Sequence, residues 1–289
     1  MIFLSKPCFA FSFPHLARIM AEFLTPRNAQ VGAKGLDMIA SMKKTVWLVV
    51  LLLITICVGP LLSGPVAQAG DAAEFRSHGF SADKMGRYFA FEEFGTQDGS
   101  GFPFSNIYIV DLQTDKWVPQ TPIRILLEDE SQPQLAARIQ AFQQATPLME
   151  KYGISNSGVM MAASPLNEVS DKAQLEFRQS INPLLSNQLG SYRLQLSNID
   201  VRDLNNCGFQ NGRVMGFSLS LTKPNGQSTT LHDESTAPQS RGCPSQYHLI
   251  AVFAPNRHRE ATYAVALVGV FSQGFEGPDL RYIAVPFSF

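Results

Sequence analysis

Short β-type runs, separated by turn signals, follow one another along most of this sequence. Arg87 to Phe94 (RYFAFEEF) and Ser105 to Leu112 (SNIYIVDL) are rich in aromatic and β-branched residues. Tyr192 to Val201 (YRLQLSNIDV) alternates apolar with polar positions, as a half-buried strand does. Asn225 and Gly226 form a strong hairpin signal between two further runs. The sequence therefore predicts antiparallel meanders and hairpins.

Further runs of the same kind continue to the carboxyl end. We expect additional strands at 117–118, 123–127, 159–163, 174–178, 214–221, 228–231, 247–253, 261–271 and 281–287. So many strands against a single helix indicate a mainly β fold, with α+β as the alternative class.

One segment has helical periodicity instead. Leu135, Ile139 and Phe142 recur at helical spacing. They predict a helix around 132–146 that lies on a sheet with one side in solvent. Pro147 is expected to kink this helix or to restart it.

The start of this helix has its own signal. Ser131 and Gln134 have the spacing of a capping box, in which each side chain satisfies a free backbone N–H group of the first turn. Three acidic residues precede them, where the helix dipole favours negative charge.

The amino-terminal part has the pattern of a processed segment. A basic start at Met42 to Lys44, an apolar run at 46–58 and small residues at 67–69 are typical of a secretory signal peptide. The predicted signal peptide covers Met42 to Ala69, and residues 1–41 are then an over-called amino-terminal extension.

Two consequences follow for the location of the protein. Residues 70–289 are expected to form a single secreted β-rich domain in the periplasm or outside the cell, without a stable membrane span after cleavage. The alternative is a membrane anchor, because Thr45 to Leu62 is long enough for a tilted span.

The net charge of the predicted mature chain excludes two classes of partner. Residues 70–289 hold 17 Lys and Arg against 22 Asp and Glu, a net charge of −5. Nucleic acids and anionic membranes bind basic surfaces, so neither is expected as a partner.

Cys207 and Cys243 are the only cysteines of the predicted mature chain. In an oxidising compartment an isolated pair favours one disulfide, and the alternative is two buried free thiols. No Cys/His pattern suggests a metal, and no cofactor is expected.

The common catalytic motifs are missing or lack their context. Ser81 to Lys84 matches SxxK, but the SDN and KTG motifs of that chemistry do not occur. His232 has a neighbouring acid, Asp233, which points away from it in a strand. Glu92 and Glu93 are likewise expected on opposite faces of a sheet. We therefore favour a protein that is not an enzyme.

Two glycine-rich segments are the best candidates for ligand contact. Gly95 to Phe104 (GTQDGSGFPF) is predicted as a long loop, and Gln273 to Asp279 (QGFEGPD) as a second one. The alternative is that the apolar residues of the first loop simply pack it down as a cap. The candidate ligand residues are Gln97, Asp98, Ser100, Glu276 and Asp279.

Three stretches resemble a known family. They are GFSADKMGRYFAFEEFGTQDGSGFPFSNIYIVDLQTDKWVPQTPIR, the SRGCP around Cys243, and VALVGVFSQGFEGPDLRYIAVPF. They are similar to a bacterial family of predicted secreted proteins, domain of unknown function 2259. The resemblance implies export and no activity. The first stretch also resembles one blade of the propeller repeats of periplasmic translocation proteins, which implies a partly propeller-blade-like meander.

These observations lead to two hypotheses about function. The first is a non-catalytic binding or envelope-associated module whose partner is an unknown small molecule or an envelope protein. The alternative is a secreted hydrolase whose site gathers Asp98, either Glu92 or Glu93, and a histidine from distant strands.

Overall fold

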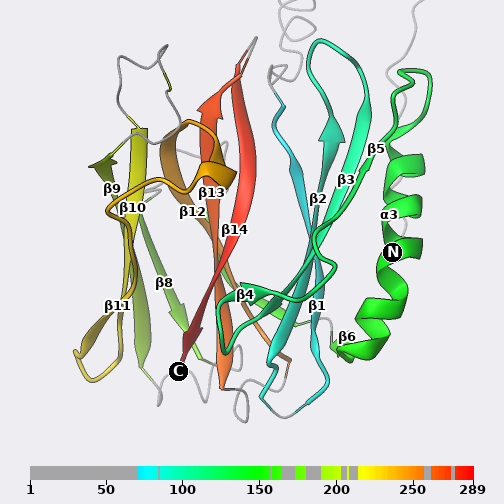
Figure 1. Cartoon of the computed structure of the whole chain (residues 1–289). Coiled ribbons are helices and arrows are strands. Elements are labelled where there is room, and N and C mark those ends of the chain that lie inside the picture. The colour runs from blue at the N-terminus through cyan, green and yellow to red at the C-terminus, as the bar shows by residue number, and fades with distance from the viewer. Residues whose placement is uncertain are drawn as a thin grey trace, which may run out of the picture. The chain divides into compact units, whose positions relative to one another are not determined.

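The computed structural model describes residues 71–83, 85–156, 158–164, 173–179, 190–202, 207, 214–256, 262–274 and 277–289. The predicted signal peptide, the alternative membrane anchor and Glu276 lie outside these ranges. Within them, three antiparallel sheets and the helix α3 (Gln134–Lys151) are stacked as layers (Figure 1). The prediction of a mainly β fold with one α-helix is confirmed.

The sheet nearest α3, which we call the helix-side sheet, has the order β4-β3-β2-β1-β6, with β5 also paired to β3. Its first four strands form a consecutive antiparallel meander. The strands are β1 (Glu74–Ser81), β2 (Tyr88–Thr96), β3 (Pro103–Asp111), β4 (Lys116–Trp117), β5 (Ile123–Leu126) and β6 (Ile154–Asn156).

The other two sheets are the central sheet, with the order β14-β13-β12-β7, and the outer sheet, with the order β11-β10-β9-β8. A short 3₁₀ helix, η3 (Gln239–Arg241), lies between β11 and β12. The strands are β7 (Val159–Ala163), β8 (Gln174–Arg178), β9 (Ser191–Val201), β10 (Val214–Thr222), β11 (Ser228–Asp233), β12 (Pro244–Ala254), β13 (Tyr263–Gln273) and β14 (Pro278–Ser288).

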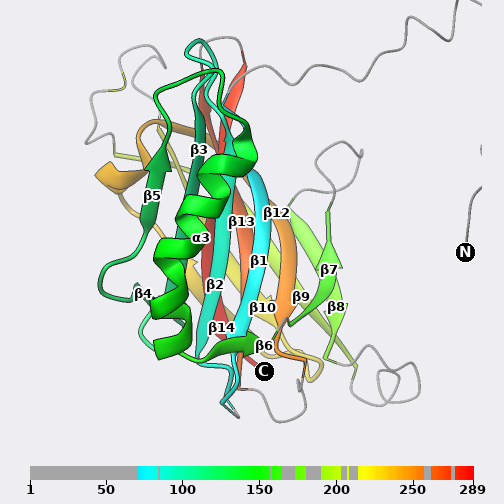
Figure 2. The same cartoon turned by 90° about the vertical axis from the view of Figure 1, so that its right-hand side faces the viewer.

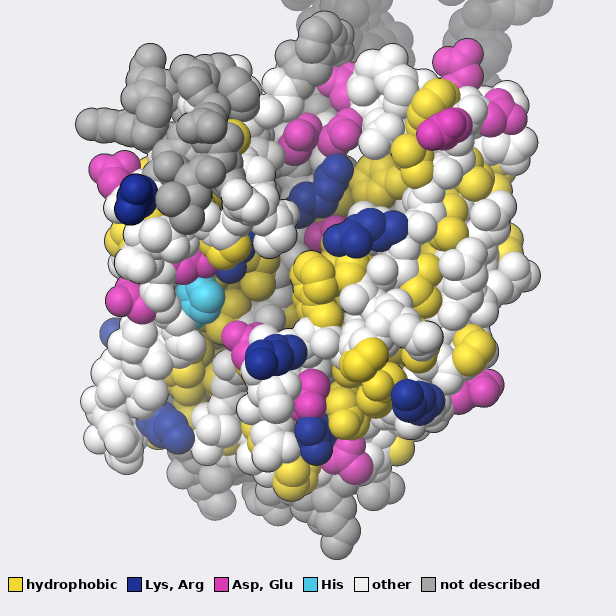
Figure 3. Space-filling view, viewed as in Figure 1, with side chains coloured by type: hydrophobic (Ala, Val, Ile, Leu, Met, Phe, Trp, Pro, Cys, Tyr) yellow, Lys and Arg dark blue, Asp and Glu magenta, His cyan; other side chains and the backbone are white. Residues whose placement is uncertain are grey.

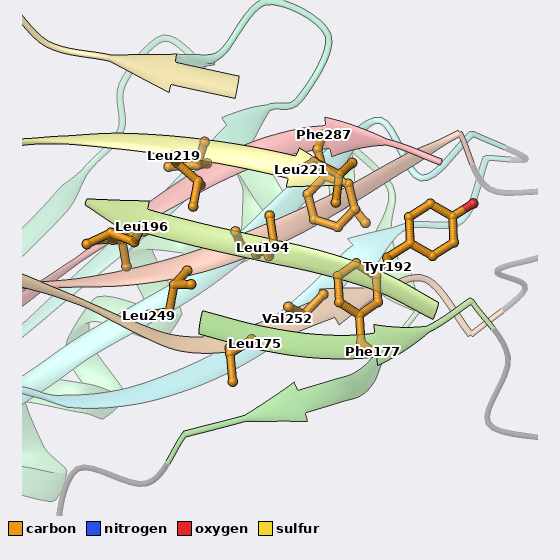
Figure 4. Packing of buried hydrophobic residues seen from close by; sticks show 14 of the residues in the cluster. Leu175, Phe177, Tyr192, Leu194, Leu196, Leu219, Leu221, Leu249, Val252 and Phe287 are labelled. Carbon is orange, nitrogen blue, oxygen red and sulfur yellow. The ribbon is translucent and has the colours of Figure 1, made fainter. Parts of the chain in front are cut away.

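The central sheet is buried on both faces. In β13, Ala266 and Val268 pack toward the outer sheet, whereas Val265 and Leu267 pack toward the helix-side sheet. A strand covered on both faces needs apolar side chains at successive positions, which explains the uninterrupted run AVALVGVF. Figure 4 shows the first of these cores, where leucines of β9 and β10 meet side chains of β12 and β14.

Helix α3 lies across the outward face of the helix-side sheet (Figure 2). The side that touches the sheet carries Ala137, Ala141 and Ala145, spaced four residues apart and fully buried. Small side chains let the helix approach the isoleucines of β3 closely. Leu135, Ile139 and Phe142, whose spacing predicts the helix, are instead largely exposed.

The predicted start of the helix is wrong. The capping box does not form, because the N-cap residue is Pro133 and Ser131 donates its hydroxyl hydrogen bond to Asp129. Pro147 does not end the helix, which continues to Lys151. A proline removes one backbone donor and need not break a helix that is held by packing on both sides of it.

Two strands, β1 and β6, are not predicted from the sequence. In β1 the pairing with β2 shifts register between Ser77 and Gly79, where Gly79 has a φ of 101°. This β-bulge and the polar residues of EFRSHGFS hide the alternation by which strands are recognised.

The predicted disulfide between Cys207 and Cys243 is present. Cys207 is fully buried beside Val214 and Ala237. In the part of the chain that the structure describes, no helix has the length and apolar character needed to cross a membrane.

Candidate functional site

A cleft of about 400 Å³ opens along β14, between the helix-side sheet and the outer sheet. This volume is within the range of small-ligand sites. In Figure 3, which looks onto the molecule from this side, cationic, acidic and histidine side chains gather around a hollow with hydrophobic walls. The titratable residues that line the cleft are Glu93, Tyr108, Asp115, Arg124, His232, Arg241, Arg281 and Tyr282.

Glu93 lies at the base of the cleft and is 1% exposed. Strand β2 directs its side chain toward the central sheet, where it accepts hydrogen bonds from the Tyr108 hydroxyl (3.0 Å) and the Tyr282 backbone N–H. Burial raises the pKa of Glu93, and the hydrogen bonds and the charge of Arg281 offset this only in part. The protonated acid is thus favoured over a wider pH range than in water.

The two tyrosines beside Glu93 remain hydrogen-bond donors. Burial, and then the charge of Glu93, raise the pKa of both Tyr108 and Tyr282. The Tyr282 hydroxyl donates to the Ala73 carbonyl oxygen at 2.9 Å. The base of the cleft is therefore a connected polar network that joins the helix-side sheet to the central sheet.

Two arginines on the helix side of the cleft differ in their partners. Arg281 of β14 donates to the backbone carbonyls of Asp71 and Leu280, and its guanidinium lies 4.9 Å from the centre of the Phe104 ring. Arg124 of β5 is exposed, and among the described residues no carboxylate forms an ion pair with it. Its guanidinium is thus available to a ligand.

The opposite wall is organised around Glu234, a residue that directly follows β11 and is 9% exposed. It accepts hydrogen bonds from Arg241, from Nε2 of His232 (2.9 Å) and from the Phe217 backbone N–H (3.2 Å). The His232 ring also stacks on Phe217, with 4.4 Å between ring centres. The acid that pairs with His232 is therefore Glu234 and not the neighbouring Asp233.

A family model described as "Predicted secreted protein (DUF2259)" matches residues 90–288. The chain belongs to this family. The DUF2259 match begins in β2 and ends in β14, so it includes Glu93, Arg124 and every other titratable residue of the cleft. No curated protein matches the sequence.

The two predicted loops are shorter than expected. Gly95 and Thr96 pair with Phe104 and Pro103 as the ends of β2 and β3, so the first loop contains only residues 97–102. The extended pairing arises because Gly95 lets the Phe104 ring pass close to its backbone. In the second segment, Gln273 pairs with Pro278 and Asp279 with Ser272, so these predicted loop residues belong to β13 and β14.

The candidate loop residues lie together but outside the cleft. Asp71 joins them, because it accepts a hydrogen bond from the Asp98 backbone N–H and donates its own N–H to Asp279 at 2.9 Å. Ser100 donates to the side chain of Gln97 within the loop. None of the described loop residues lines the cleft. Their binding role stays a prediction, and Glu276 lies outside the described residues.

Glu92 and Glu93 face opposite sides of the helix-side sheet, as predicted. Glu92 points toward α3, where it binds Arg138 through both carboxylate oxygens, at 2.8 and 2.9 Å, and accepts the Ser105 hydroxyl. His78 is 3.5 Å away. The residues of the alternative hydrolase site are thus divided among three places: the helix side, the cleft and the loop around Asp98.

Sequence reasoning missed the principal polar residues of the cleft. Arg124, Tyr108 and Arg281 occur singly in strands and match no motif. One usable signal was the pair His232 and Glu234, since residues two apart in an extended chain share a face, and Glu234 directly follows β11. Within the described ranges, no group of three or more His, Cys, Asp or Glu side chains is placed to hold a metal ion.

Proposed function

We propose that this family member is an exported, non-catalytic binding module whose cleft binds a ligand through an anionic group. The observation that carries the proposal is Arg124, a guanidinium at the cleft without a carboxylate partner among the described residues. Arginine forms paired, charge-assisted hydrogen bonds with carboxylates and phosphates, which makes it the residue most suited to this contact.

The other charges of the cleft support an anion over a cation. Arg281 adds a second guanidinium on the same side. The acids that face them are weakened as anions, because burial raises the pKa of both Glu93 and Asp115. Arg281 and Arg241 are paired with Asp71 and Glu234, so the charge that is left for a ligand is that of Arg124.

Export to the periplasm or the cell exterior is the second part of the proposal. The predicted signal peptide and the disulfide both favour an oxidising compartment. If the signal is cleaved after Ala69, amino-terminal sequencing of the protein recovered outside the cytoplasm should give Gly70 as its first residue. Recovery of a chain that still carries Thr45 to Leu62 in the membrane fraction would favour the anchor instead.

Arg124→Ala is expected to weaken anion binding about tenfold, because one charge-assisted contact is lost. Citrate and inorganic phosphate serve as probes, with binding measured by calorimetry and by the rise in melting temperature. The matched control is Arg193→Ala on β9, where an exposed arginine pairs with Glu176 away from the cleft. If Arg193→Ala and Arg124→Ala changed binding equally, or if neither probe bound, the cleft would not be an anion site.

A further inference from the structure

Strand β14 is an edge of the central sheet, and the cleft follows this edge. β14 pairs with β13 along eleven residues without a register shift, and no strand of the described ranges is paired on its other side. Five consecutive residues of β14, 281–285, line the cleft. Successive side chains of a strand point to opposite faces of its sheet. Consecutive residues can therefore all line one cleft only if the cleft lies along the backbone edge of the strand.

The hydrogen bonds that Leu280 makes on this edge show which backbone groups point into the cleft. Leu280 donates its N–H to the Asp71 carbonyl (3.3 Å) and accepts from the Ala73 N–H (3.0 Å). In an antiparallel pair the groups that point away from the partner strand recur at every second residue. Tyr282, Ala284 and Pro286 therefore also turn their backbone groups away from β13.

Only some of the outward backbone groups of β14 form hydrogen bonds within the protein. The segment Asp71 to Ala73 runs parallel beside Leu280, and the chain then leaves for the helix-side sheet at β1. The Tyr282 N–H is taken by the Glu93 carboxyl. In the described part of the chain, no group pairs with the N–H or the C=O that Ala284 turns toward the cleft. The carbonyls of Tyr282 and Pro286 flank it.

We infer that a short extended peptide of a partner protein adds to β14 in the cleft, as a further strand of the central sheet. This inference rests on the proposed function, because it identifies the anionic group as an acidic side chain of the peptide held by Arg124. Addition of a strand supplies affinity through backbone hydrogen bonds, here with Ala284 at the centre. Alternate side chains of the peptide would contact Tyr108 and Trp117 on one side and His232 on the other.

The length of the free edge argues for a peptide rather than for a second copy of this chain. Asp71 to Ala73 covers one end, Glu93 uses the Tyr282 donor, and Pro286 has no N–H to offer. Covered ends and an edge proline are the devices by which sheets avoid pairing edge to edge. What remains open is a short segment between two walls, which admits a single strand.

The test begins with a phage-displayed library of random peptides about seven residues long, selected on the exported, disulfide-bonded protein. We expect selected peptides to alternate β-branched residues with polar ones and to carry an acid. A synthetic copy should lose about tenfold or more in affinity on Ala284→Pro, which removes the outward N–H and leaves the hydrogen bonds to β13 without loss of a donor. Ala284→Ser keeps that N–H and is the matched control, and the melting temperature of both variants shows whether they are folded.

Two measurements on the unaltered protein keep the inference falsifiable if Ala284→Pro does not fold. Single N-methylation along the peptide should abolish binding at alternate backbone positions only, because every second amide faces β14. Exchange of the Ala284 amide hydrogen, followed by NMR, should slow when the peptide is added. Strand addition would be overturned if the selection enriched no peptide, or if the effects of N-methylation did not alternate along the peptide. Citrate binding that still depends on Arg124 would then leave the proposed function intact.

Discussion

Replacing both Cys207 and Cys243 by serine is expected to lower the free energy of unfolding by about 3 to 4 kcal/mol. The two cysteines are 36 residues apart in sequence, so the disulfide restricts a large part of the unfolded chain. In the chain-entropy model the stabilisation grows with the logarithm of the closed loop. The loop here includes β10, β11 and η3, three elements at one side of the cleft.

Urea denaturation followed by tryptophan and tyrosine fluorescence measures this loss. Trp117 and Tyr108 report on the helix-side wall of the cleft, since their rings are 5.5 Å apart. Adding a reductant to the unaltered protein should reproduce the destabilisation, whereas the double serine variant should not respond to reductant. A variant whose unfolding free energy stays within about 0.5 kcal/mol of the parent would show that the loop is held by packing alone.

The disulfide also bears on the cleft itself. Cys243 follows Arg241 by two residues, and Pro238, Ser240 and Arg241 line the wall opposite Arg124. Loss of the bridge frees this wall from Cys207 without removing any group that touches the cleft. We therefore expect ligand affinity to fall together with stability in the reduced protein.

The second large effect concerns the ion pair between Glu92 and Arg138. Glu92→Gln is expected to destabilise the protein by about 3 kcal/mol at pH 7, because removing one member of a buried pair leaves the other charge without compensation. The Glu92 side chain is 3% exposed, and the Arg138 guanidinium is held between it and the Phe94 ring, 3.7 Å from the ring centre. This contact fixes α3 to the helix-side sheet. Glu128→Gln, an exposed position before the helix, is the control.

The same pair predicts how stability changes in acid. Burial alone would raise the pKa of Glu92, but the two hydrogen bonds from Arg138 and the nearby His78 outweigh it and lower the pKa to about 2. A carboxyl with a lowered pKa stabilises the fold above its unfolded value of 4.5 and loses that contribution as pH falls toward about 2. The Glu92→Gln variant should therefore lose less stability across this range than the parent. An equal slope in both proteins would contradict the assignment.

The adjacent Glu93 should respond with the opposite sign. Its pKa is raised, so the folded state binds the proton more tightly and stability declines as pH rises above the unfolded value. Gln at this position accepts the Tyr282 N–H and donates to the Tyr108 hydroxyl, which keeps both contacts. Glu93→Gln is expected to remove this decline, measured by denaturation at pH 5 and pH 8. The pKa values of these two neighbouring glutamates thus shift in opposite directions for two different reasons: ion pairing at Glu92 and desolvation at Glu93.

Most of the strands can be predicted from the local order of apolar and polar residues, because that order depends on which faces of the strand are buried. The run in β13 is apolar at successive positions since both of its faces are covered, and β9 alternates since only one face is covered. The helix was located correctly from Leu135, Ile139 and Phe142, yet its buried side consists of alanines. A sheet close to a helix selects small residues, and a search for large apolar ones finds the exposed side.

The cleft could not be predicted in the same way. Glu93 and Arg124 are brought together by their pairing on either side of Asn106 in the helix-side sheet, and Arg281 joins them because this sheet packs on the central sheet. The residues next to them in the sequence carry no pattern that indicates this arrangement. The loop residues around Asp98 were favoured for their composition; Asp71 binds the Asp98 backbone N–H and Ser100 binds Gln97, while their contact with a ligand stays a prediction.

The central sheet is made largely from the last part of the described chain, and both other sheets pack against it. The contact between Asp71 and Asp279 alone joins residues 208 apart. If the chain is exported with its amino end first, as we propose, neither core can be completed before β12 to β14 have emerged. Until then the apolar faces of the earlier strands stay exposed, and only chaperones or contacts with one another would protect them from aggregation. In that case the order of the strands makes release of the carboxyl end the event that allows both cores to be completed.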